Sequence, residues 1–246
     1  HLMVYFNAPA LQSLLVEMGL DSSVQYQSGD MLFWVDSNIG FNKVDAVILR
    51  KMIYEVDMTD LDHPKAHLTM EYEHPIPVEI PCVHEATYGK EIAYTNMFQR
   101  CYWDYWRVYT APSTQLMKAN VQFIPGDFLL SGNDWRIKLD LESDLPGTGM
   151  VGGLQVISTN STSKIDLYFD LSPEILTYQS GIIGYQLTIH KQFGLKEIPI
   201  NFVLKLPYEY QFISMPEETK LNSESVEIAF PLIRNSAIFE FTFTRN

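Results

Sequence analysis

Residues 52–59 read MIYEVDMT, and residues 68–73 read LTMEYE. In both stretches every second side chain is apolar, and most of the side chains between them are polar. This period of two is typical of a β-strand with one buried face and one wet face. It recurs along the chain, most clearly in WRIKLDLE at 135–142, and again over 165–169, 185–189, 200–206, 226–230 and 239–243, while residues 31–35 form an uninterrupted apolar run. Many short strands separated by Gly, Pro, Asn and Ser predict a mainly β protein, with one or two antiparallel β-sandwiches.

A short helix is predicted before these strands. Asn7 stands where an N-cap belongs, Pro9 falls in the first turn, and Gly19 provides a stop. The apolar residues between them recur at helical spacing and share one face; they are Leu11, Leu14, Leu15 and Met18. The apolar run at 2–6 predicts a strand ahead of the helix.

Glycine and proline cluster at residues 145–153, which include Pro146, Gly147 and Gly149. Such a cluster predicts a boundary between a β-rich region at 1–145, which holds the helix, and a second sandwich region at 146–246. A weaker break at Leu206-Pro207 leaves open whether residues 207–246 form a separate unit.

The charge excludes two classes of partner. The 246 residues carry 17 Lys and Arg against 30 Asp and Glu, a net charge of −13. Without a cluster of basic residues, binding to nucleic acid or to an anionic membrane surface is not expected. No run approaches the roughly 18–20 apolar residues that cross a bilayer, so we expect no spanning segment in this chain.

The stretch VDSNIGFNKVDA at 35–46 holds the best candidate metal ligands. Asp36, Asn38, Asn42 and Asp45 supply oxygen atoms around a glycine, the composition of a Ca²⁺ loop. The final Glu of an EF-hand is missing. A plain turn whose side chains bond their own backbone explains the same residues. Ca²⁺ is the one cofactor that this pattern leaves open.

The stretch CYWDYWRVY at 101–109 holds five aromatic rings in nine residues. In a strand, Trp103, Tyr105 and Arg107 share one face, and Trp106 belongs to the other. Exposed rings would offer a platform for sugar stacking, and buried rings would serve the core. These four residues are the candidate ligand-binding set.

Cys82 and Cys101 are the two cysteines of the chain. Free buried thiols, a disulfide, or metal or catalytic use all remain open from the spacing alone. A disulfide would indicate an oxidising compartment. Catalytic motifs give no candidate residue: no nucleophile elbow and no phosphate-binding loop is found, and no pair of acids stands out.

Three blocks resemble a bacterial family of domains of unknown function, catalogue number 4012. They are LMVYFNAPALQSLLVEMGL, VDSNIGFNKVDAVILRKMIYEVDM and CYWDYWRVYTAPSTQLMKA, and HKQFG at 190–194 is similar to a further run of that family. The resemblance implies a large envelope protein with an anchor upstream and an extracytoplasmic body. It also implies an upstream region similar to LytR-CpsA-Psr phosphotransferases, and it favours a Cys82–Cys101 disulfide.

These observations together predict a non-catalytic, extracytoplasmic module of a bacterial cell-envelope protein. Its expected partners are a cell-surface polysaccharide or another envelope protein. Two alternatives remain: an envelope glycan transferase or hydrolase that uses acidic residues, and a purely structural or adhesion domain.

Overall fold

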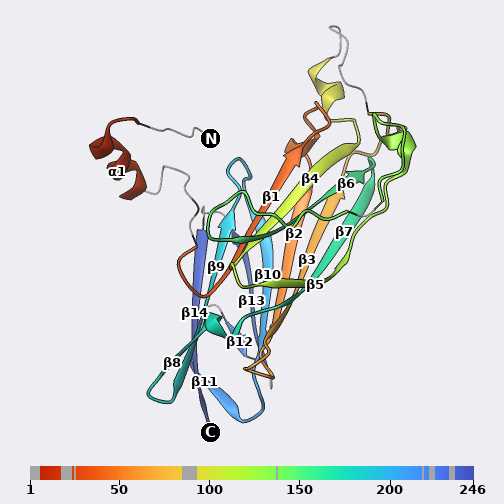
Figure 1. Cartoon of the computed structure of the whole chain (residues 1–246). Coiled ribbons are helices and arrows are strands. Elements are labelled where there is room, and N and C mark those ends of the chain that lie inside the picture. The colour runs from red at the N-terminus through yellow and green to blue at the C-terminus, as the bar shows by residue number, and fades with distance from the viewer. Residues whose placement is uncertain are drawn as a thin grey trace.

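Two seven-stranded sheets pack face to face in the computed structural model of the chain (Figure 1). It describes residues 6–17, 24, 26–84, 93–136, 138–217, 219–221, 225–232 and 236–246. The first sheet has the order β11 (Tyr210–Ser214), β14 (Ser236–Arg245), β9 (Ile182–Lys191), β1 (Asp30–Asn38), β4 (Tyr102–Thr110) and β6 (Gly149–Ile157), and β8 (Leu176–Gln179) also pairs with β9. The second has the order β12 (Lys220–Leu221), β13 (Ser225–Leu232), β10 (Ile198–Lys205), β2 (Leu49–Asp57), β3 (Lys65–His74), β7 (Ser161–Asp170) and β5 (Gln115–Asn120). The predicted mainly β sandwich is confirmed.

The sheets are mixed rather than purely antiparallel. β1 runs parallel to β9, and β2 runs parallel to β10. Strands from both sides of residue 145 contribute to each sheet, because β4 pairs with β6 and β3 pairs with β7. The boundary predicted at residue 145 therefore falls within one shared pair of sheets, and strands from 207–246 lie at the edges of both.

The core follows from the period-two pattern. In β2, Met52, Tyr54 and Val56 point between the sheets and are at most 1 % exposed. Their neighbours Lys51 and Asp57 face solvent. Each apolar side chain of this size that leaves water stabilises the fold by about 1.5–3 kcal/mol, so the alternation itself selects which face of each strand is buried.

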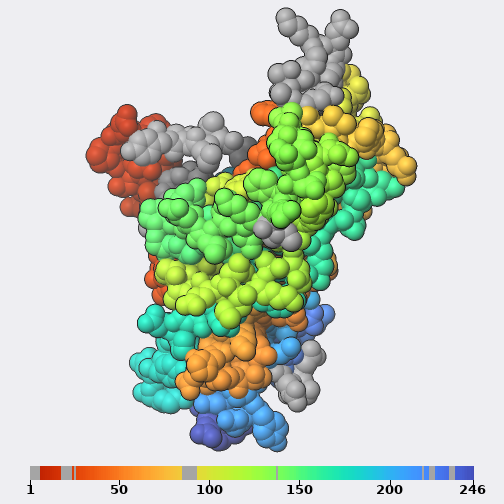
Figure 2. Space-filling model, turned by 45° about the vertical axis from the view of Figure 1, so that its right-hand side comes forward, coloured from red at the N-terminus to blue at the C-terminus, as the bar shows by residue number. Residues whose placement is uncertain are grey.

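The strand predicted at 135–142 is wrong, although Ile137 lies outside the described residues. The described part of this segment makes two isolated bridges, Trp135 with Ile124 and Asp140 with Gly152, and Leu141 stays 61 % exposed. The reason is that residues 138–145 form a strap: its backbone meets the edge strand β6 at Asp140, and its carboxylates Asp140 and Asp144 bond to side chains on the outer face of β4. Figure 2 shows the green residues of this part of the chain at the surface of the molecule.

Three of the glycines at the predicted boundary, Gly149, Gly152 and Gly153, belong to strand β6. A Cβ atom on Gly153 would lie 2.7 Å from Cζ2 of Trp106, and one on Gly152 would lie 3.1 Å from the hydroxyl of Tyr105. These two positions therefore lack side chains because rings of the neighbouring strand occupy the space. Composition alone could not distinguish this requirement from a linker.

The predicted helix is confirmed as α1 (Pro9–Glu17). None of its residues is buried, and it stands away from the sheets in Figure 1. The strand predicted at 2–6 lies outside the described residues except for Phe6, as do Met18 and Gly19. Four 3-10 turns complete the described elements: η1 (Val44–Ala46), η2 (Tyr94–Met97), η3 (Gly126–Phe128) and η4 (Pro173–Ile175).

Candidate functional site

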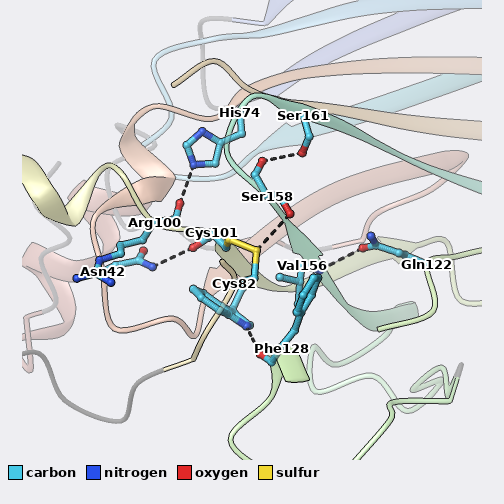
Figure 3. The surroundings of a disulfide bond; sticks show 11 residues. Asn42, His74, Cys82, Arg100, Cys101, Gln122, Phe128, Val156, Ser158 and Ser161 are labelled. Carbon is cyan, nitrogen blue, oxygen red and sulfur yellow. Dashed lines mark hydrogen bonds between the residues drawn. A yellow bond between two sulfur atoms is a disulfide. The ribbon is translucent and has the colours of Figure 1, made fainter. Parts of the chain in front are cut away.

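A disulfide joins Cys82 to Cys101 beside the start of β4, with the two Cα atoms 5.5 Å apart. Both residues are buried, in a cluster that includes Trp103. Hydrogen bonds from side chains to backbone carbonyls fix the residues around the disulfide. The amide of Asn42 donates to the carbonyl of Cys101 at 3.1 Å, and the indole of Trp103 donates to the carbonyl of Phe128 at 2.7 Å (Figure 3). The disulfide is therefore a built-in part of this end of the sandwich.

The two tryptophans of the predicted ligand-binding set have no free face. Trp103 is 2 % exposed and packs in the disulfide cluster. Trp106 is fully buried and lies between the sheets. Because sugar stacking needs an open ring face, the burial of both indoles supports the packing interpretation that the sequence had left open.

The other two members, Tyr105 and Arg107, lie under the strap. The guanidinium carbon of Arg107 is 5.9 Å from the ring centroids of both Tyr105 and Tyr109. Arg107 also donates to Asp144 at 3.1 Å, and the hydroxyl of Tyr109 donates to the same carboxylate at 2.6 Å. Burial and the bond to Asp144 raise the pKa of Tyr109 to about 12. The strap carboxylates Asp140 and Asp144 thus already occupy the polar groups of this row.

The four predicted Ca²⁺ ligands separate into two pairs. Asp36 and Asp45 both bind the guanidinium of Arg50, whose side chain is 3 % exposed. Asn38 donates to the side-chain oxygen of Asn42 at 2.9 Å and accepts from the turn backbone at 3.0 Å. Among the described residues, no group of three or more His, Cys, Asp or Glu side chains is arranged to hold a metal ion. The Ca²⁺ site stays a prediction.

Two further carboxyl groups are enclosed between the sheets. Asp104 accepts hydrogen bonds from the backbone N–H of Ser37 at 3.1 Å and from the amide of Gln155 at 2.9 Å. Burial, and then the charge of Asp36, raise the pKa of Asp104 well above its ordinary value. Asp30 accepts from two tyrosine hydroxyls at 2.7 Å, and burial raises its pKa too. Neither acid has a solvent-facing side on which a substrate could bind.

Residues of the edge strands β11 and β12, one from each sheet, line a hollow of about 550 Å³. Strand β11 lies near the C-terminus in Figure 1. Tyr208 on its wall is 93 % exposed. The rest of its described lining is a mixture of apolar and polar side chains: Thr59, Lys205, Leu206, Pro207, Tyr210, Gln211, Phe212, Met215, Leu221, Ser225 and Asn246. The sequence analysis missed this site. Its signal was the pair of tyrosines in LPYEY at 206–210, which follows a strand and was interpreted only as a break.

Comparisons with known proteins show a fold and no family. No protein family matches the sequence, and no curated protein matches it. A similar solved structure is a Legionella pneumophila protein described as a "putative nutrient binding protein", with a TM-score of 0.51 and 5 % identity over 88 % of this chain and 71 % of that chain. An M1 zinc metallopeptidase from Deinococcus radiodurans gives a TM-score of 0.34 and 7 % identity over 80 % of this chain and 42 % of that chain. The first likeness indicates a shared fold.

No helix among the described residues has the length and apolarity needed to span a bilayer.

Proposed function

We propose that this chain is a non-catalytic, extracytoplasmic module of a bacterial cell-envelope protein that binds or scaffolds surface polysaccharide. The disulfide carries the proposal. Cys82 and Cys101 are buried among packed side chains, so the bond is part of the folded core. Structural disulfides of this kind persist in oxidising compartments outside the cytoplasm. We also propose that the chain is related to the 4012 family, which implies a membrane anchor upstream of this region.

The shared fold adds support for binding rather than catalysis. The similar Legionella structure is described as a nutrient binder, which is a recognition function. Three acids of the core are not open to a substrate, since Asp30 and Asp104 are enclosed and Asp36 pairs with Arg50. The burial of Trp103 and Trp106 favours the structural or adhesion domain as the second candidate.

Two measurements test the proposal. Cells that make the protein are fractionated, and the protein is alkylated without reductant and analysed by mass spectrometry. We expect it in the envelope fraction with both cysteines unmodified; recovery from the cytosol with two alkylated thiols would contradict the location. The purified protein is then screened by thermal shift against polysaccharides extracted from the same envelope. A saturable rise in melting temperature is expected, because a ligand that binds only the folded state stabilises it. No shift with any fraction would refute polysaccharide binding and leave the structural role.

A further inference from the structure

We infer that the hollow between β11 and β12 is the ligand site, and that it binds neutral pyranose units of a glycan. This inference rests on the proposed function and adds to it a site and a class of ligand.

One wall of the hollow, strand β11, is packed against the core. The ring of Tyr210 packs edge-on against Phe243 at 6.0 Å, and Phe212 packs against the same ring at 6.2 Å. Phe243 itself is fully buried. These rings of β11 are thus continuous with the sandwich core, so a ligand that contacts them would meet side chains that are already ordered.

Tyr208 supplies the exposed ring. It lies in a turn that the backbone N–H of Tyr210 closes by donating to the carbonyl of Pro207 at 3.0 Å. Proline restricts the turn, while the Tyr208 side chain stays 93 % exposed. A tyrosine presents a flat apolar face together with a hydroxyl. The C–H face of a pyranose matches that flat face, and its hydroxyls match polar groups around it.

The polar lining is suited to hydroxyl groups rather than to charge. Thr59 and Ser225 contribute hydroxyls, and Gln211 contributes an amide that both donates and accepts. Lys205 is the one charged side chain among the described lining residues, and it interacts with the nearby carboxylate of Asp57. With a net charge of −13 on the chain, an anionic ligand would be repelled at long range. A neutral sugar is therefore the favoured occupant.

The test is titration calorimetry with four probes: maltotetraose, cellotetraose, diacetylchitobiose and tetragalacturonate. Amide NMR spectra recorded during the titration locate the site. We expect at least one neutral probe to bind and to shift the signals of residues 205–215. Tyr208→Ala should weaken this binding at least about tenfold, while Tyr208→Phe, which keeps the ring, should stay within about threefold. Tyr94→Ala is the matched control, since Tyr94 is 66 % exposed in η2 at the other end of the sandwich and its loss should change nothing.

The possible negative results distinguish three errors: a wrong site, a wrong class of ligand, and a wrong proposed function. If a neutral probe binds with unchanged affinity to Tyr208→Ala, and shifts signals elsewhere, the site is refuted and polysaccharide binding stands. If tetragalacturonate binds more tightly than every neutral probe, the class of ligand is refuted. If neither the probes nor the envelope polysaccharides bind the wild-type protein, this inference and polysaccharide binding fail together.

Discussion

Replacing Asp104 by Asn should stabilise the protein at neutral and alkaline pH. Asp104 is fully buried, with the carboxylate of Asp36 nearby, and Arg50 is shared between Asp36 and Asp45. Burial and the charge of Asp36 raise the pKa of Asp104, so the folded state holds its proton more tightly than the unfolded chain does. The free energy of unfolding must then fall as pH rises from about 4 through the raised pKa, by up to about 1.4 kcal/mol per pH unit.

The amide fits the same hydrogen bonds. Gln155 donates to one Asp104 oxygen at 2.9 Å, and its own carbonyl accepts from the hydroxyl of Ser163 at 3.0 Å. If Gln155 turns its amide over, it accepts from the new Asn and donates to Ser163, while the N–H of Ser37 keeps its acceptor. The substitution therefore removes a group that must take up a proton on folding, without leaving a donor unpaired, so the pH-dependent loss of stability disappears.

The assay is urea unfolding followed by tryptophan fluorescence at pH values from 5 to 8. We expect the free energy of unfolding of Asp104→Asn to exceed that of the wild type by about 1–3 kcal/mol at pH 8, and the difference to shrink toward pH 5. Asp104→Ala is the control; it also lacks the titrating carboxyl but leaves Ser37 and Gln155 without an acceptor, so it should be about 2–4 kcal/mol less stable than Asp104→Asn at every pH. If the Asn variant runs parallel to the wild type across the whole range, Asp104 is not the titrating group and the reasoning is wrong.

Three further changes test the core, the disulfide and the loop. Trp106→Ala should lower the free energy of unfolding by about 3–5 kcal/mol because the ring is fully buried; a loss below about 0.5 kcal/mol in denaturant titration would mean that the ring is not core. Replacing Cys82 and Cys101 together by Ser should cost about 3 kcal/mol, since the bond closes a loop of 19 residues; an unchanged urea midpoint would contradict this. A chelator should leave the melting temperature unchanged because Arg50 already binds both acids of the 35–46 loop; a drop that Ca²⁺ reverses would establish the metal site.

The sequence predicted the strands wherever one face is buried and the other is wet. β2 and β3 show this, since their alternation matches the burial of every inward residue from Met52 to Val56 and from Leu68 to Tyr72. The strand prediction failed at residues 135–142, because the same alternation occurs there in the strap. A period of two says that side chains point both ways, and it does not say whether a second strand is available to pair.

The candidate site was only partly accessible to the same reasoning. Trp103 and Trp106 were noticed because aromatic residues are conspicuous, yet their burial depends on Gly153 and on loop residues that approach from elsewhere in the chain. Tyr208 was overlooked because an exposed ring beside a proline looks like an ordinary turn. Whether a side chain is exposed depends on the tertiary structure, and the exposure of Tyr208 depends on which strands lie beside its turn.

The two ends of the sandwich should respond differently to substitution. At the end that carries η2, the disulfide, Trp103 and the pair of Arg50 with Asp36 are enclosed, so changes there should alter stability and leave sugar binding alone. At the opposite end Tyr208 has almost no packing to lose, so its replacement should alter binding and leave stability within about 0.5 kcal/mol. If Tyr208→Ala weakened binding only by lowering the melting temperature, the hollow would be a packing element. Measuring the urea midpoint and the sugar affinity on Tyr208→Ala and Asp104→Asn together therefore separates a recognition site from a structural one.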